Sequence, residues 1–162
     1  MNILIITASL PYPPASGGAL RALGIIRGLR AAGHNVTLLS FHDREDDPQQ
    51  TPLVADCDDI ITLSPPVRPS WKRLRDLLLT SRADISQRLY SPEFAQRLLT
   101  LLTEHRFDLI QFEGIEAACY LPLVRNSGTD ARICFDTFNA EAELQHVIYT
   151  IDRQQIRRWP TA

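Results

Sequence analysis

Two kinds of hydrophobic pattern alternate along the chain. Continuous apolar runs, several of them β-branched, predict buried strands at 2–8, 36–41, 59–63, 107–112 and 131–136. Between them, apolar residues recur at helical spacing and predict helices at 19–32, 70–79, 92–105, 115–124 and from Asn139 onward. Strands that alternate with helices predict an α/β fold, a Rossmann-like doubly wound parallel sheet flanked by helices.

The first predicted strand and helix are joined by a segment with two adjacent glycines, Gly17 and Gly18. This turn lies where α/β sheets bind ligands, beyond the carboxyl end of a strand. Without a Cβ, both glycines allow backbone N–H groups to approach a phosphate or sugar at the positive end of the helix. Arg21, in the first helical turn, is then a candidate phosphate contact. The alternatives are an ordinary turn and a solvated arginine.

Two nucleotide-binding motifs are absent from this unit. The glycines at 17, 18 and 24 do not have the spacing of a dinucleotide fingerprint, and the second strand ends in Ser40-Phe41 instead of an acid. No Gly-Lys-Ser/Thr follows the turn, which excludes a P-loop.

Composition narrows the class of protein further. The 162 residues suit one domain, and the net charge of −2 gives no reason to expect a nucleic-acid partner. Three cysteines without metal spacing predict reduced thiols in a cytoplasmic protein. The amino terminus lacks the features of a signal peptide or membrane span. The acidic stretch 42–59 predicts a solvated loop.

The predicted helix at 70–79 is amphipathic and basic, with Trp71 and leucines on one face and Lys72, Arg73 and Arg75 offset from it. Such a helix can lie on an anionic membrane, which would place the protein peripherally on the inner membrane face. The alternative is that its apolar face packs on the sheet.

Polar or flexible residues follow three of the predicted strands, at 16–18, 113–114 and 136–141. The carboxyl ends of parallel strands lie on one side of a sheet, so these segments should converge over a crevice. Acids and an amide there could orient sugar hydroxyls and accept a proton. The alternatives are local: Glu113 and Asn139 could cap the helices that follow them, and Glu141 could complement a helix dipole.

Three motifs resemble the amino-terminal domain of family 4 glycosyltransferases. They are the opening from Ile3 through Pro13-Pro14-x-x-Gly17-Gly18 to Gly33-His34-x-Val36, the segment Asp108-Leu109-Ile110-Gln111-Phe112-Glu113, and the segment Phe135-Asp136-Thr137-Phe138-Asn139-Ala140-Glu141. The resemblance spans nearly the whole chain. It implies one half of a GT-B fold, in which the active site lies between two Rossmann-like domains.

The resemblance also implies roles for single residues. Gly17 and Gly18, with Arg21 nearby, match the loop that reaches the donor phosphates and the acceptor. Glu113 stands where many members carry a histidine proposed to handle the acceptor proton, and a carboxylate can do that work. Asn139 and Glu141 match a polar pair that binds the acceptor, whereas Phe138 replaces a frequent histidine.

Residues 1–162 are therefore expected to be the acceptor-binding half of a retaining, metal-independent glycosyltransferase. Its co-substrate would be a nucleotide-sugar and its acceptor a glycan, a lipid-linked glycan or a small hydroxyl compound. The carboxy-terminal donor-binding domain is not in this sequence, so the chain alone should be nearly inactive. The alternative is a stand-alone binding or regulatory module that pairs with another chain or with itself through the last helix, where Ile151, Ile156 and Trp159 lie.

Overall fold

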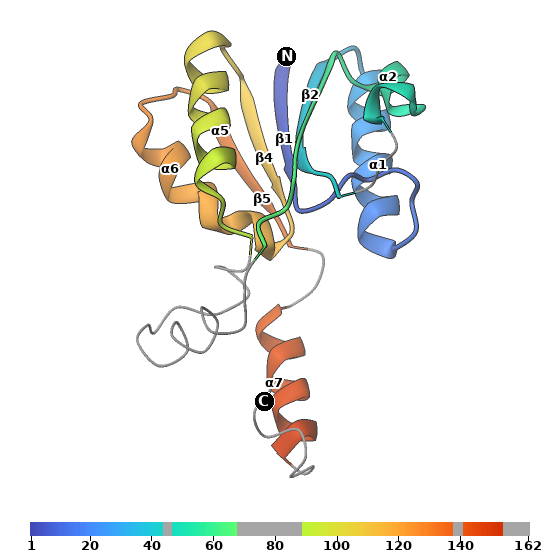
Figure 1. Ribbon diagram of the computed structural model, residues 1–162, viewed down its shortest axis with the longest axis vertical. Coiled ribbons are helices and arrows are strands. Elements are labelled where there is room, and N and C mark those ends of the chain that lie inside the picture. The colour runs from blue at the N-terminus through green and yellow to red at the C-terminus, as the bar shows by residue number, and fades with distance from the viewer. Residues whose placement is uncertain (44–46, 68–88, 138–140, 154–162) are drawn as a thin grey trace.

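The computed structural model describes residues 1–43, 47–67, 89–137 and 141–153, and these contain a five-stranded, all-parallel sheet in the order β3-β2-β1-β4-β5 (Figure 1). The strands are β1 (Asn2–Thr7), β2 (Asn35–Phe41), β3 (Asp59–Leu63), β4 (Leu109–Glu113) and β5 (Arg132–Asp136). The predicted Rossmann-like α/β fold class is confirmed. The order of the strands reverses between β1 and β4, and such a reversal opens a crevice at the carboxyl ends of the two strands.

Apolar residues alternate between the two faces of β1 and form two cores. Ile3 and Ile5 face α1 (Gly17–Ala31) and α2 (Leu53–Asp56), together with Leu23, Ile26 and Leu53. Leu4 and Ile6 belong to the opposite core, together with α5 (Pro92–Glu104), η2 (Ile115–Tyr120) and α6 (Leu121–Asn126). Figure 1 shows the two groups of helices on either side of the strands, as expected for a parallel sheet buried on both faces.

The helix α1 begins at the first glycine of the pair, two residues earlier than predicted. Ser16 is its N-cap and accepts a hydrogen bond from the backbone N–H of Ala19 at 3.2 Å. Gly17 and Gly18 therefore form the first turn of the helix and not a loop before it, which corrects the sequence prediction. Neither has a positive φ, so the backbone does not require glycine at these positions.

Loss of this cap should measurably weaken the protein. We expect Ser16→Ala to lower the free energy of unfolding by about 1 kcal/mol, because one N–H of the first turn loses its acceptor. Urea denaturation measures the change, with Ser64→Ala as a control in an exposed segment outside helices and strands. Equal losses in both variants would mean that the cap contributes nothing specific.

Two further segments differ from the sequence prediction. The expected solvated loop at 42–59 contains η1 (Pro48–Gln50) and α2, and Leu53 and Cys57 are buried against β1 and β2. The expected helix at 115–124 divides into η2 and α6. Helical periodicity gave no signal for η1 and α2 and no boundary between η2 and α6, because each of these elements spans at most six residues.

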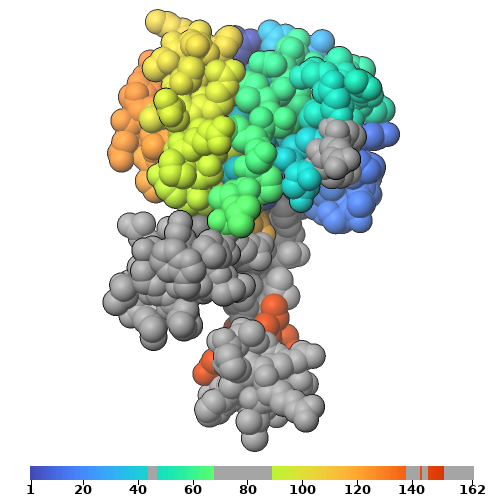
Figure 2. All heavy atoms as spheres, viewed as in Figure 1, coloured from blue at the N-terminus to red at the C-terminus, as the bar shows by residue number. Residues whose placement is uncertain are grey.

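On the face of the molecule drawn in Figure 2, α5 lies beside the segment that follows β3. Leu63 at the end of β3 packs against the same core as Phe94 and Leu98 of α5. The last described helix, α7 (Glu141–Arg153), exposes Val147, Ile148 and Ile151. The predicted basic helix at 70–79 and Asn139 lie outside the described residues.

Candidate functional site

One polar residue stands in the same register position of every strand, close to the carboxyl end of the sheet. Thr7 of β1 pairs with Ser40 of β2 and with Glu113 of β4, and Glu113 pairs with Asp136 of β5. Thr62 of β3 pairs with Ser40 and completes what we call the polar row. Residues paired in register on parallel strands point to the same face, here the one that α1 covers.

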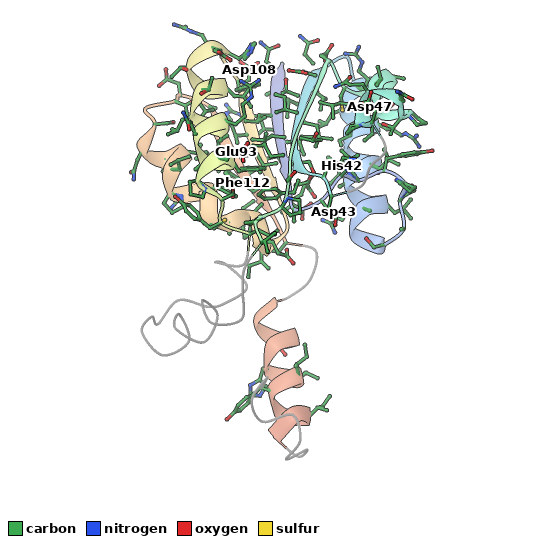
Figure 3. The ribbon with its side chains drawn as sticks, viewed as in Figure 1. His42, Asp43, Asp47, Glu93, Asp108 and Phe112 are labelled. Atoms are coloured by element: carbon green, nitrogen blue, oxygen red, sulfur yellow. The ribbon has the colours of Figure 1, made fainter. Side chains whose placement is uncertain are left out.

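The ends of the sheet can be followed in Figure 3. His42 and Asp43, which follow β2, mark the carboxyl end of the strands, and Asp108, which precedes β4, marks the opposite end. The polar row therefore lies near the end of the sheet at which His42 is drawn. Within the row, Thr7 donates a hydrogen bond to Ser40 over 2.9 Å, and Ser40 donates to the carbonyl of Phe41 over 3.0 Å.

Glu113 is the most unusual member of the polar row, because its carboxyl is buried and only half satisfied. The residue is 1% exposed, and its Oε1 accepts a hydrogen bond from Gln111. Its Oε2 is buried without a hydrogen-bond partner among the described residues. A buried polar atom without a partner is costly, and in native proteins such an atom marks local strain, a bound water or ion, or a catalytic role.

The surroundings of Glu113 raise its pKa above the ordinary value of 4.5. Burial is the main cause, since it disfavours the charged form, and the charge of Asp136 acts in the same direction. The Gln111 hydrogen bond and the charge of Arg21 lower the pKa and only partly offset these effects. A carboxylate with a raised pKa is a stronger base than an ordinary glutamate.

Glu113 borders a cavity of about 220 Å³ between the first turn of α1 and the carboxyl ends of β1 and β4. Its wall includes Thr7 and Glu113 from the polar row, Ser16 and Gly18 from the start of α1, and Glu116 from η2. A second hollow of about 340 Å³ shares Ala8, Ser9 and Glu116 with the first and extends toward His42 and Pro65. The two hollows are therefore neighbours at the carboxyl end of the sheet.

Arg21 pairs with a carboxylate while its side chain remains 49% exposed. Its Nη2 donates to Asp136 Oδ1 at 2.7 Å and to Oδ2 at 2.8 Å, while Nε donates to Oδ2 at 3.2 Å. The pair joins the first turn of α1 to the end of β5 and stabilises the guanidinium charge, which raises the pKa of Arg21.

The structure brings some of the predicted site residues together. Gly18 and Glu113 line one cavity, and Arg21 lies close enough to influence the charge of Glu113. Gly17 is in the same helical turn, and a Cβ added there would meet nothing within 4 Å. Glu141 is the first residue of α7, and its side chain is outside the described part of the structure, as is all of Asn139.

The alternative cap role of Glu113 is wrong. Gly114, with φ +83°, occupies the N-cap position of η2, and no side chain caps that helix. Glycine is suited to this left-handed conformation, and its N–H donates to the carbonyl of Asp136 at 2.9 Å. Glu113 is therefore directed into the structure at the end of β4 and does not serve the next helix.

Sequence reasoning missed Thr7, Gln111 and Glu116 as parts of the site. A signal existed for Gln111, because it stands two residues before Glu113 in an otherwise apolar strand and must share its face. Thr7, the last residue of the first apolar run, carried a weaker signal of the same kind. Glu116 carried none, since η2 shows no pattern of its own.

Within the described ranges, no group of three or more His, Cys, Asp or Glu is arranged to hold a metal ion. Over the same residues, no helix is long and apolar enough to cross a membrane. Cys57 is buried, and burial raises the pKa of its thiol to about 12, which makes it a weak nucleophile.

The sheet and its helices define a Rossmann-like domain with a cavity at the switch point of the sheet. A family model described as "Glycosyl transferase 4-like domain" matches residues 16–159. The chain belongs to this family of glycosyltransferase domains. No curated protein sequence matches the chain.

Solved structures share the fold at low sequence identity. Two crystal structures of the C-terminal domain of a hydrogenase from Pyrococcus furiosus are both 18% identical and cover 83% of this chain, with TM-scores of 0.54 and 0.53. The chain spans 90% and 89% of those two structures. A UGT transferase from Siraitia grosvenorii, solved in complex with UDP, is 14% identical with a TM-score of 0.46, and the match covers 82% of this chain and 27% of that one. At 18% identity the likeness to the two Pyrococcus furiosus structures concerns the fold alone.

Proposed function

We propose that the chain is the acceptor-binding half of a retaining, nucleotide-sugar-dependent glycosyltransferase. In this arrangement it forms one Rossmann-like half of a GT-B enzyme, and the donor sugar is held mainly by a second domain. The observation that carries the proposal is the unpartnered Oε2 of Glu113 beside a cavity at the switch point of the sheet. An acceptor hydroxyl would donate to this oxygen and complete its hydrogen bonding.

The chemistry follows from the position of Glu113. The acceptor oxygen forms a bond to the anomeric carbon of the donor sugar, and the bond from that carbon to the diphosphate breaks. The proton of the acceptor hydroxyl passes to the Glu113 carboxylate, and the raised pKa of that carboxyl makes it a stronger base than an ordinary glutamate. In a retaining transfer the new bond lies on the same face of the sugar as the bond that breaks.

The start of α1 is suited to the leaving diphosphate. Gly18 lines the cavity, and the N-terminus of a 15-residue helix attracts negative charge. Gly17 adds a second residue without a side chain to the same first turn of α1. Asn139 and Glu141, which follow β5, are proposed to contact the acceptor. Helix dipoles and basic groups would stabilise the leaving diphosphate, and this stabilisation makes the proposed reaction metal-independent.

A transfer assay with the complete enzyme, in which this domain is joined to its donor-binding domain, tests the proposal. We expect transfer from a nucleotide-sugar with retention of anomeric configuration, read from the anomeric proton coupling in NMR spectra. We also expect full activity in excess chelator. Inversion of configuration would reject the retaining mechanism, and loss of activity with chelator would reject metal independence.

A second candidate function is supported by the exposed apolar residues of α7. Val147, Ile148 and Ile151 would suit a contact with another chain or a second copy, as in a binding or regulatory module. Sedimentation over a range of concentrations separates the two functions. A stable dimer that Ile148→Glu converts to monomer would favour the module, whereas a monomer at all concentrations would favour the glycosyltransferase half.

A further inference from the structure

The strongest feature outside the cavity itself is the ion pair between Arg21 and Asp136. The two residues are 115 positions apart in the sequence, and their side chains make three hydrogen bonds. Their side chains are 49% and 19% exposed, and an ion pair exposed to this extent stabilises a fold little. Its placement therefore points to a role other than holding the domain together.

The pair flanks Glu113 with charges of both signs. Asp136 is the register partner of Glu113 on the neighbouring strand, and the backbone N–H of Gly114 donates to the Asp136 carbonyl. Arg21 reaches the same place from α1 on the face to which the polar row points. We propose that Arg21 and Asp136 are positioning residues that set the charge state of the Glu113 carboxyl. This proposal rests on the proposed function for its catalytic meaning.

The other groups around Glu113 do not duplicate this effect. From β4, Gln111 contributes an uncharged amide that donates to Oε1. From β1 and β2, Thr7 and Ser40 contribute hydroxyls that bond to one another and to the backbone. From η2, Glu116 is the other acidic residue in the cavity wall. Among the described residues, Arg21 and Asp136 are the charged side chains whose fields act on Glu113.

The two members of the pair act on Glu113 in opposite directions. The negative charge of Asp136 disfavours ionisation of Glu113, and the positive charge of Arg21 favours it. Removing either residue breaks the same ion pair, so a purely structural role predicts similar consequences from both changes. An electrostatic role predicts consequences of opposite sign.

The titration of Glu113 in the 162-residue chain provides the test. With glutamate labelled at its carboxyl carbon, NMR follows ionisation in Asp136→Asn and in Arg21→Gln. We expect the midpoint of Glu113 to fall by about one pH unit in the first variant and to rise by about one in the second. Arg21→Lys keeps the charge and should restore a midpoint close to that of the unchanged chain.

A matched control lies on the same helix. Arg27 and Asp56 form an ion pair of 3.0 Å with nearly identical exposure, 52% and 19%, but farther along α1 toward its carboxyl end. Arg27→Gln and Asp56→Asn should leave the Glu113 midpoint unchanged. Movement of the midpoint in the same direction in both Arg21→Gln and Asp136→Asn, or in neither, would overturn the proposal.

A kinetic measurement then links the pair to the reaction. In the complete enzyme, the pH at which kcat reaches half its maximum should shift down in Asp136→Asn and up in Arg21→Gln, as the NMR midpoints do. If the NMR midpoints shift in opposite directions but no sugar transfer is found, the charge-setting role stands and the proposed function fails. If transfer occurs with unshifted midpoints, the proposed function stands and the charge-setting role fails.

Discussion

Replacement of Glu113 with Gln should lower kcat for sugar transfer by about 10²- to 10⁴-fold, the range typical of a lost general base. Glutamine has nearly the same shape and can still accept the hydrogen bond from Gln111, but it cannot take the acceptor proton. The variant is therefore expected to lose kcat but to keep the folded structure. Steady-state kinetics of the complete enzyme measure it, together with the circular dichroism spectrum of the variant.

The dependence of kcat on pH gives a sharper form of the same prediction. In the unchanged enzyme, kcat should rise with pH through the raised pKa of Glu113, because the ionised carboxylate is the active base. Glu116→Gln, an equally conservative change in the wall of the same cavity, should keep that rise. A Glu113→Gln enzyme with unchanged kcat and an unchanged pH profile would remove Glu113 from the reaction.

The same substitution should also change how stability depends on pH. Since burial raises the pKa of Glu113 in the folded state above its ordinary value of 4.5, the folded protein binds this proton more tightly than the unfolded chain. The resulting stabilisation is complete below the pKa that Glu113 has in the unfolded chain. It is lost as the pH rises through the pKa that Glu113 has in the folded protein. Each unit of difference between the two corresponds to about 1.4 kcal/mol.

Glu113→Gln removes this ionisation, so the variant should gain stability relative to the unchanged protein as pH increases. Urea denaturation at about pH 5 and about pH 8 would show the difference, with a larger gain at the higher pH. A gain of the same size at both pH values would contradict the assignment of a buried, titrating carboxyl at this position.

The second large effect is expected at the start of α1. Gly18→Val should weaken binding of the nucleotide-sugar at least about tenfold, or 1.4 kcal/mol, because Gly18 lines the cavity and a branched side chain there occupies space beside the diphosphate. The measurement is KM for the donor in the complete enzyme. Valine should fold at this position, because the φ of Gly18 is not positive.

Gly17→Val is the matched control for this change. It places the same β-branched residue in the same helical turn, but a Cβ at Gly17 meets nothing within 4 Å, and Gly17 is not part of the cavity wall. Helix propensity should affect both variants similarly. Equal values of KM in Gly17→Val and Gly18→Val would show that the turn has only a structural role.

Much of the fold is readable from local pattern. The apolar runs that become β1 and β2 predict buried parallel strands, and the alternation of strands with helices predicts the layers. Ser91, the N-cap of α5, was also recognisable, because serine is a preferred residue at that position, whereas the sequence offered Glu113 and not Gly114 as the cap of η2.

The site was predictable only in outline. Parallel strands run in one direction, so their polar carboxyl ends were expected to converge. The register of Thr7, Glu113 and Asp136 agrees with this expectation. The ion pair of Arg21 with Asp136 was not predictable, because it depends on how far α1 reaches across the sheet toward β5. The half-satisfied state of Glu113 likewise depends on packing that no local pattern encodes.

The proposed function depends most closely on whether acceptor hydroxyls bind at Glu113. Carboxyl-labelled chain would be titrated with sugars, oligosaccharides and small polyols, and separately with free nucleoside diphosphate, while the Glu113 resonance is followed by NMR. We expect a saturable shift of this resonance with at least one hydroxyl compound, whether or not the donor-binding domain is present. No shift with any of them, together with tight binding of the nucleoside diphosphate alone, would contradict it and make this chain the donor-binding half.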